Sequence, residues 1–255
     1  MKRIFIVIFL VFVSLGGLYF ANSINFKKDE TKVLGEELQR ESSAVEVSFG
    51  DEKYAVYWSV LSNLDTLELI PNFDDSQTAS SAFDKYGCEL LISGGFYTEA
   101  GKPIGLFRAN SETIQEFSVN VLMNGVFSVN DFSTPRITRE VPGDPLKIAL
   151  QTGPILIENS FNQKLNLASD KNARRVISAV TGDNKLIFMV IYDPKSVFLG
   201  PELVDLPQIV SLVSAENDLN IADAINLDGG SASAFKSRDF SLSEISPVGS
   251  FFCLQ

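Results

Sequence analysis

The chain begins with an uncharged apolar run, which limits the part that can fold in water to the residues after it. Lys2 and Arg3 precede residues 4–21, which are mostly Ile, Val, Phe and Leu. The run is longer than the apolar core of a cleaved signal peptide, about 7–15 residues, and almost reaches the ~20 residues that span a bilayer. Residues 1–23 are therefore predicted to be a signal anchor or a signal peptide. We favour the uncleaved anchor, which places the rest of the chain outside the cytoplasm, anchored to the membrane; cleavage would make it secreted.

The remaining chain divides into a short linker and one domain. Residues 24–43 are polar and charged and lack a strong apolar period, so they are predicted to be a linker. Residues 44–255 contain short alternating segments, with no internal repeat and no break in composition. They are predicted to form a single domain.

Helices are expected at three places and hairpins at two. Residues 76–86 and 201–214 have helical patterns, and residues 144–151 could form a short helix with Pro145 in its first turn. The turn dipeptide at 124–125 predicts a hairpin between residues 117–123 and 126–129, and the turn at 182–184 predicts a hairpin between residues 174–181 and 185–192. Hairpins with segregated helices predict an α+β fold, with a mixed, largely antiparallel sheet and flanking helices.

Charge and composition exclude several function classes. The net charge is −11, and beyond the apolar run no Lys/Arg cluster is larger than a pair such as 174–175, so no nucleic-acid partner is expected. Histidine is absent, which removes Ser-His-Asp and Cys-His chemistry and His-ligated zinc sites. Catalysis must then use carboxylates, Arg, Lys, Tyr or hydroxyls. No cofactor is predicted, and a divalent metal is left open.

The two cysteines allow two interpretations. Cys88 and Cys253 would lie outside the cytoplasm, where they could form a disulfide. Both also have apolar neighbours, which is typical of small buried thiols in strands. We favour the buried thiols.

The most informative loop follows an apolar strand at residues 224–227. Residues 226–231 (Asn-Leu-Asp-Gly-Gly-Ser) place a carboxylate where the strand ends, before two glycines that permit close approach of the backbone to a ligand. Such a loop can offer backbone N–H groups to an anion. A tight turn with a capping Asp explains the same residues.

Three further segments carry weaker signals. Residues 93–97 (Ser-Gly-Gly-Phe-Tyr) again combine a strand end with two glycines, followed by rings that could stack on a sugar or pack inside. Arg174 and Arg175 begin an apolar strand, where a guanidinium could clamp a phosphate or pair with Asp170 at a solvated strand end. Residues 151–154 (Gln-Thr-Gly-Pro) offer an amide and a hydroxyl beside a turn.

Taken together, these segments resemble the phosphodiester glycosidases. Residues 225–233 are similar to that family's N-L-D-G-G-x-S signature. Residues 93–97 are similar to N-G-G-F-F, 103–106 to P-x-G-L, 149–154 to A-L-Q-x-G-P and 173–177 to A-R-T-A-I, in the family's order. Two positions depart from the pattern, because Ser93 replaces an Asn and Ser178 replaces a Gly. A serine hydroxyl cannot reproduce the separate donor and acceptor of an amide.

The resemblance implies hydrolysis between a sugar's anomeric carbon and a phosphodiester oxygen. Asp228 would stabilise an oxocarbenium-like state, attack it or activate water, and Arg174 would neutralise the leaving phosphate. These two are the expected catalytic residues. A second carboxylate cannot be ranked among Glu99, Glu158 and Asp183. The expected substrate-binding residues are Ser93, Gly94, Gly95, Phe96, Gln151, Gly153, Asn226, Gly229, Gly230 and Ser231.

We therefore predict a hydrolase that releases a sugar from a glycosyl-1-phosphodiester, of the N-acetylglucosamine type, on extracytoplasmic glycans or envelope polysaccharide. Its expected partners are the glycan phosphodiester and the membrane, through the N-terminal segment. Two alternatives stay open. One is a catalytically weakened module that binds glycan phosphates, and the other is a metal-dependent phosphodiesterase, which could leave a sugar phosphate.

Overall fold

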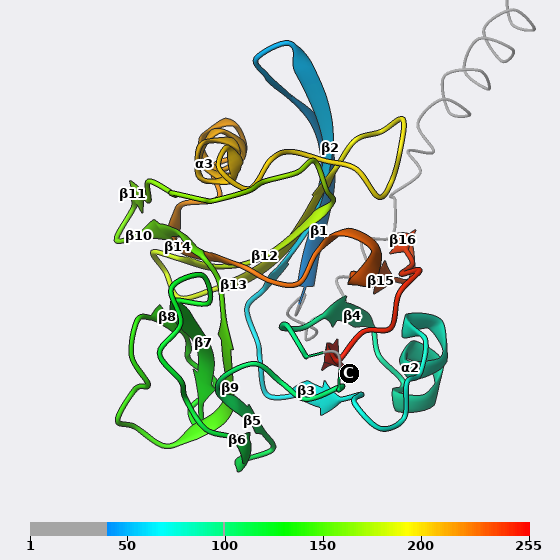
Figure 1. The fold of residues 1–255 in the computed structure, drawn as a ribbon, viewed down its shortest axis with the longest axis vertical. Coiled ribbons are helices and arrows are strands. Elements are labelled where there is room, and N and C mark those ends of the chain that lie inside the picture. Colours follow the sequence, from blue (N-terminus) through cyan, green and yellow to red (C-terminus); the bar gives the residue numbers. More distant parts are fainter. Residues whose placement is uncertain (1–39, 99) are drawn as a thin grey trace, which may run out of the picture. The chain divides into compact units, whose positions relative to one another are not determined.

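The computed structural model describes residues 40–98 and 100–255, which form one compact unit (Figure 1). The expected anchor or signal segment lies outside the described residues, as does the linker up to residue 39. Residues 40–43, expected at the end of that linker, instead begin the first strand. No helix within the described part is long and apolar enough to cross a bilayer.

In the described residues, seventeen strands form three sheets, and every pairing between named strands is antiparallel (Figure 1). The seven-stranded sheet has the order β1 (Arg40–Phe49), β2 (Glu52–Leu61), β13 (Leu186–Tyr192), β12 (Arg175–Thr181), β14 (Ile221–Asn226), β10 (Ile155–Glu158) and β11 (Phe161–Asn162). One five-stranded sheet has the order β16 (Ser241–Leu242), β15 (Phe235–Ser237), β4 (Leu90–Ser93), β17 (Ser250–Leu254) and β3 (Leu67–Pro71). The other has the order β6 (Glu112–Gln115), β5 (Phe107–Ala109), β9 (Leu146–Thr152), β7 (Gly125–Asn130) and β8 (Pro135–Thr138). The expected single mixed sheet is thus replaced by three antiparallel sheets.

The three sheets share one hydrophobic core, in which one phenylalanine from each sheet contacts the others. The ring of Phe252 on β17 lies 5.4 Å from that of Phe127 on β7 and 5.1 Å from that of Phe188 on β13. All three side chains are fully buried. Burying a Phe side chain stabilises the folded state by about 1.5–3 kcal/mol, so this contact joins the sheets into one domain.

Two of the expected helices are confirmed. α2 (Ala79–Tyr86) begins after Thr78, whose side chain accepts a hydrogen bond from the N–H of Ser81, and it ends at Gly87, which has a φ of 66°. A left-handed residue at this position favours glycine. α3 (Leu206–Glu216) buries its apolar side in a second core, formed with the seven-stranded sheet. A one-turn 3-10 helix, η1 (Gly230–Ala232), lies next to the Asp228 loop.

Two local predictions are wrong. Residues 144–151 form no helix, because residues 146–152 are the central strand β9, nearly all buried. The hairpin expected at Asn124-Gly125 is also absent: residues 117–124 form a loop and β7 begins at Gly125. Gly125 serves packing there, since a Cβ atom would lie 2.6 Å from Ile225 and 2.7 Å from Ile155. The hairpin expected after residue 181 is confirmed by the pairing of β12 with β13.

The cysteines form a disulfide, which corrects the preference for free thiols. Cys88 follows α2 and Cys253 lies in β17, and their Cα atoms are 5.5 Å apart. The bond joins the helix end to the central part of a five-stranded sheet. Disulfides persist in oxidising compartments, so this one supports a location outside the cytoplasm.

Candidate functional site

A pocket of about 610 Å³ lies at the end of β14, where the Asp228 loop begins. This volume falls in the range of small-molecule sites. The lining residues are Phe96, Leu122, Gly153, Ser169, Asp170, Lys171, Ala173, Arg175, Leu203, Asn226, Asp228, Gly229, Gly230, Ser231 and Ala232. Seven of the expected site residues are among them: Phe96, Gly153, Asn226, Asp228, Gly229, Gly230 and Ser231.

Backbone contacts on two sides hold Asp228 in the pocket. Leu227 donates its N–H to the carbonyl of Val176 at 2.8 Å, and Asp228 donates its own to the carbonyl of Gly94 at 3.0 Å. A Cβ atom at Gly229 would lie 2.5 Å from the carbonyl oxygen of Arg174, so only glycine fits there. The loop is therefore packed against β12 and against the segment after β4.

The carboxyl group of Asp228 has an unusual proton affinity. Burial raises its pKa to about 7, and a hydrogen bond from the N–H of Gly229 at 2.9 Å acts in the opposite direction. Burial, and then the charge of Asp228, raise the pKa of Tyr97. Tyr97 therefore lies within electrostatic range of Asp228, although it was not among the expected site residues. A carboxyl group that titrates near neutral pH inside a pocket is suited to acid-base or nucleophilic chemistry.

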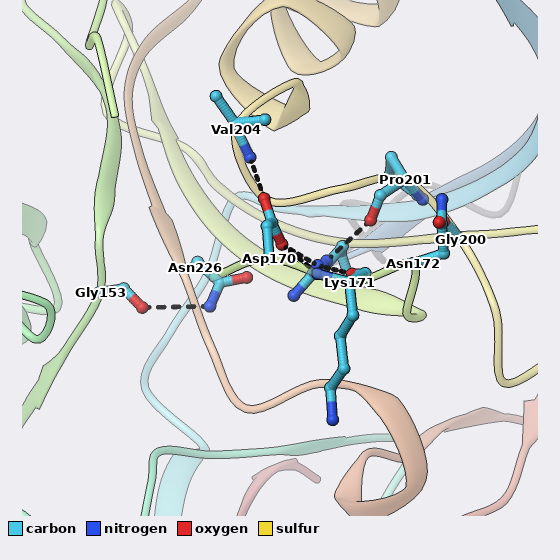
Figure 2. Close-up of polar contacts among 9 residues, drawn as sticks. Gly153, Asp170, Lys171, Asn172, Gly200, Pro201, Val204 and Asn226 are labelled. Atoms are coloured by element: carbon cyan, nitrogen blue, oxygen red, sulfur yellow. Dashed lines mark hydrogen bonds and ion pairs between the residues drawn. The ribbon is translucent and has the colours of Figure 1, made fainter. Parts of the chain in front are cut away.

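Asn226 forms the floor of the pocket and has one unused acceptor. It is 3% exposed, its amide nitrogen donates to the carbonyl of Gly153 at 3.1 Å, and Gly153 donates its N–H back to the carbonyl of Asn226 at 3.1 Å. The amide oxygen is buried without a hydrogen-bond partner among the described residues. Figure 2 shows the amide nitrogen directed at Gly153 and the oxygen on the other side. A buried acceptor without a partner is costly, so this oxygen is the strongest sign of a ligand that donates a hydrogen bond.

A buried ion pair forms another wall (Figure 2). Arg175 contacts Asp170 at 3.2 Å and donates to the carbonyls of Lys171 at 2.7 Å and Pro201 at 3.0 Å. Burial lowers the pKa of Arg175, while Asp170 opposes this effect. The sequence suggested Asp170 as a partner of the pair Arg174-Arg175, and in the structure the partner is Arg175.

Asp170 has the opposite character to Asp228. Burial acts to raise its pKa, but hydrogen bonds from backbone N–H groups, followed by the charge of Arg175, hold the pKa below its usual value. The N–H of Val204 donates to it at 2.9 Å and that of Lys171 at 2.8 Å. Asp170 is thus an ionised, fully hydrogen-bonded carboxylate that fixes the arginine.

Lys171 adds a second positive charge. Its side chain is exposed and extends away from the ion pair (Figure 2). Within residues 40–98 and 100–255 no carboxylate forms an ion pair with its ammonium group. This group is available to an anionic ligand.

Arg174 lies outside the pocket wall. It is fully buried, and its guanidinium donates to the hydroxyl of Ser233 at 2.9 Å, to the carbonyl of Ser233, and to the carbonyls of Ser243 at 2.9 Å and Val197 at 3.2 Å. Burial lowers its pKa to about 10, with Glu244 opposing. Successive side chains along a strand point to opposite sides, so Arg175 takes the pocket side and Arg174 the other.

Arg174 nevertheless touches the Asp228 loop from behind. Its carbonyl accepts the N–H of Gly230 at 2.8 Å, and the Ser233 hydroxyl that it contacts donates to the carbonyl of Gly230 at 2.8 Å. Arg174 therefore fixes the Asp228 loop through both its own backbone carbonyl and its own side chain.

Four other expected residues also lie outside the pocket wall. A Cβ atom at Gly94 would lie 2.3 Å from the hydroxyl of Ser250, and one at Gly95 would lie 2.9 Å from Leu150, so both glycines are explained by packing. Ser93 is buried and its backbone N–H bonds to Ala234 at 2.9 Å. The fourth is Gln151, whose buried amide bonds to backbone groups of residues 106, 118 and 123.

The candidates for a second carboxylate do not line the pocket. Glu158 pairs with Arg139 at 2.7 Å and Asp183 pairs with Lys185 at 3.0 Å. Glu99 lies outside the described residues. No group of three or more Cys, Asp or Glu side chains that could hold a metal ion occurs within the described chain. The pocket's second carboxylate is Asp170.

Ser178, a departure from the family pattern, lies in the buried strand β12 away from the pocket, and its hydroxyl has no described hydrogen-bond partner. Ser178→Ala is expected to raise the free energy of unfolding by about 1 kcal/mol, because it removes an unpaired buried polar group. Ser59→Ala is the matched control in the same sheet, since its hydroxyl bonds to that of Ser42 at 2.8 Å. Urea unfolding should show the control destabilised. A lower free energy of unfolding for Ser178→Ala would contradict the view that the Ser178 hydroxyl is buried without a hydrogen-bond partner.

Comparisons with known proteins agree with this fold. The family model for phosphodiester glycosidases matches residues 86–250. No curated protein matches the chain. The catalytic domain of zebrafish N-acetylglucosamine-1-phosphodiester alpha-N-acetylglucosaminidase, auto-inhibited by its pro-peptide, has a TM-score of 0.69 at 13% identity, over 85% of this chain and 83% of that chain.

Two bacterial structures share the fold at similar distance. A hypothetical protein from Synechocystis has a TM-score of 0.65 at 13% identity, over 85% of this chain and 62% of that chain. A protein from Burkholderia pseudomallei described as exported has a TM-score of 0.51 at 10% identity, over 79% and 74% of the two chains. At identities this low, the structural similarity establishes a common fold alone.

Proposed function

Since the chain belongs to the phosphodiester glycosidase family, we propose that its pocket hydrolyses a glycosyl-1-phosphodiester and releases the sugar. The proposed substrate is of the N-acetylglucosamine type and lies outside the cytoplasm, on a glycan or envelope polysaccharide. The single observation that carries this proposal is the buried, unpartnered amide oxygen of Asn226, in the same pocket as Asp228. A sugar presents hydroxyl and amide donors that would satisfy this oxygen.

The phosphate is proposed to bind at the positively charged wall. Lys171 and Arg175 both line the pocket, and the Lys171 ammonium is available for an anion. Charge-assisted hydrogen bonds to phosphate are among the stronger polar contacts in proteins. They would also stabilise the negative charge that grows on the departing phosphate, which reduces the need for a strong general acid.

Asp228 is proposed to act on the sugar side of the bond. As the anomeric C–O bond breaks, the electron pair leaves with the phosphate monoester, and the sugar becomes oxocarbenium-like. An ionised Asp228 would stabilise this state by charge, by attack or by accepting a proton from the water that adds to the anomeric carbon. Arg174 is proposed to position the Asp228 loop instead of touching the phosphate.

The direct test is an assay for free reducing sugar with purified full-length protein and an alkyl diester of N-acetylglucosamine 1-phosphate. We expect sugar and alkyl phosphate in equal amounts. Release of N-acetylglucosamine 1-phosphate would instead support the phosphodiesterase alternative. Tight binding without turnover would support the weakened binding module.

The pH dependence of the reaction follows from the raised pKa of Asp228. If the ionised carboxylate is the active form, kcat/KM should rise with pH and level off above about 7, because Asp228 is neutral below that pH. The measurement is kcat/KM between pH 5 and 9 with the alkyl diester. A rate that falls through pH 7 would make Asp228 a proton donor and contradict this role.

A further inference from the structure

The loop between β6 and β7, residues 116–124, presents apolar side chains to solvent beside the pocket. Val119 is 95% exposed and Val121 is 92% exposed, and Phe117 and Leu122 are 38% and 43% exposed. Residues 117–123 include no charged side chain. Single exposed apolar residues are common, whereas a cluster of this kind indicates a surface that binds something apolar.

The loop holds this shape without burying its valines. The buried side chain of Gln151 accepts the N–H of Ser118 at 3.1 Å and donates to the carbonyls of Ser118 at 2.5 Å and Met123 at 3.0 Å. The side-chain oxygen of Asn120 accepts the N–H groups of Leu122 and Met123, both at 2.9 Å. Because these hydrogen bonds already fix the loop at Ser118, Leu122 and Met123, the loop can bind an apolar ligand with little loss of conformational entropy.

The apolar loop is continuous with the pocket. Leu122 belongs to both surfaces. The loop backbone rests on Gly153, where a Cβ atom would lie 2.4 Å from the carbonyl oxygen of Leu122. Gly153 is in turn bonded to Asn226 on the pocket floor. A ligand in the pocket can therefore extend over Leu122 towards the two valines.

We propose that the substrate is a sugar 1-phosphodiester of a lipid alcohol, and that the loop at residues 116–124 binds its hydrocarbon chain. This inference rests on the proposed function. The sugar lies over Asn226 and the phosphate lies at the Lys171 and Arg175 wall of the same pocket. The hydrocarbon chain is bonded to the phosphate, so it passes from the pocket over Leu122 to the loop, and it leaves with the phosphate. The net charge of −11 opposes adsorption to anionic bilayers, which favours the substrate's own chain over a membrane surface as the apolar partner.

The test compares methyl and octyl diesters of N-acetylglucosamine 1-phosphate with the full-length protein. We expect KM for the octyl diester to be about 50-fold lower, from burial of a few methylene groups. Val119→Ser with Val121→Ser should reduce this preference at least about tenfold, with kcat/KM for the methyl diester unchanged. Phe132→Ser is the matched control, because it removes an apolar side chain that is 84% exposed elsewhere. It should keep the preference.

Calorimetric binding of octyl phosphate and methyl phosphate tests the loop without turnover. If neither diester is hydrolysed but octyl phosphate binds more tightly, and the double variant loses this difference, the alkyl site stands and the proposed function fails. Equal KM values together with equal affinities for the two phosphates would overturn the inference. A chain-length preference that survives in the double variant would also overturn it. The inference would also be overturned if the protein showed no preference for the octyl diester and the double variant bound phosphatidylcholine vesicles more weakly than wild type. That result would identify the loop as a membrane contact.

Discussion

Asp228→Asn is expected to lower kcat/KM for a glycosyl-1-phosphodiester by about 10³-fold or more. The amide keeps an oxygen that can accept the Gly229 N–H, so the loop should retain its shape, whereas the amide can neither ionise nor attack. The measurement is steady-state kinetics at pH 8. Asp183→Asn is the matched control, an exposed carboxylate outside the pocket, and it should be fully active.

The same substitution should make the protein more stable at high pH. The folded-state pKa of Asp228 is about 7, above its ordinary value of 3.8, so the folded state holds a proton that the unfolded chain releases between these values. The wild-type protein therefore loses stability as the pH rises from about 4 to 7, by roughly 2–4 kcal/mol. Asp228→Asn should unfold at a higher urea concentration than wild type at pH 8, and at the same concentration near pH 3.5. Full activity of Asp228→Asn would contradict the catalytic role of Asp228. A stability difference between Asp228→Asn and wild type that is the same at pH 8 and pH 3.5 would contradict its raised pKa.

Arg174→Met is expected to lower the free energy of unfolding by about 3–5 kcal/mol. The side chain is fully buried, and removal of its guanidinium leaves the carbonyls of Val197, Ser233 and Ser243 without their donor. Glu244, whose charge raises the pKa of Arg174, would lose a partner as well. The measurement is the urea midpoint at pH 7.

Two comparisons make the Arg174 result interpretable. Arg139→Met removes an exposed two-point contact with Glu158 and should cost less than about 1 kcal/mol. Arg174→Lys keeps the charge but reaches fewer acceptors, so it should be intermediate and remain foldable. If Arg174→Met kept wild-type stability and lost only activity, Arg174 would act on the substrate and the positioning role would be wrong.

Local sequence signals predicted the elements that depend on local rules. Thr78 and Gly87 cap α2, the apolar spacing of residues 203–213 corresponds to α3, and the turn at 182–184 joins β12 to β13. The loop at Asp228 likewise needs only a strand followed by two glycines. Each of these features is determined within about ten residues along the chain.

Features set by distant contacts could not be predicted in this way. Residues 146–152 have a composition that suits a helix, yet they pair with β5 and β7 in the middle of a sheet. The identity of the arginine in the pocket wall depends on the side of the seven-stranded sheet on which the pocket lies, and the sequence contains two adjacent arginines. The disulfide depends on the packing of α2 against β17. Asp170 carried no motif, and only its contact with Arg175 shows its place in the pocket.

Hydrolysis in H₂¹⁸O tests the central claim most directly, because it reports which bond breaks. The full-length protein is incubated with the methyl diester of N-acetylglucosamine 1-phosphate, and the released phosphate monoester is analysed by mass spectrometry. Cleavage between the anomeric carbon and oxygen predicts unlabelled methyl phosphate, with the water oxygen in the sugar. Incorporation of ¹⁸O into the phosphate, or the absence of any turnover, would contradict glycosidase chemistry at the Asp228 pocket.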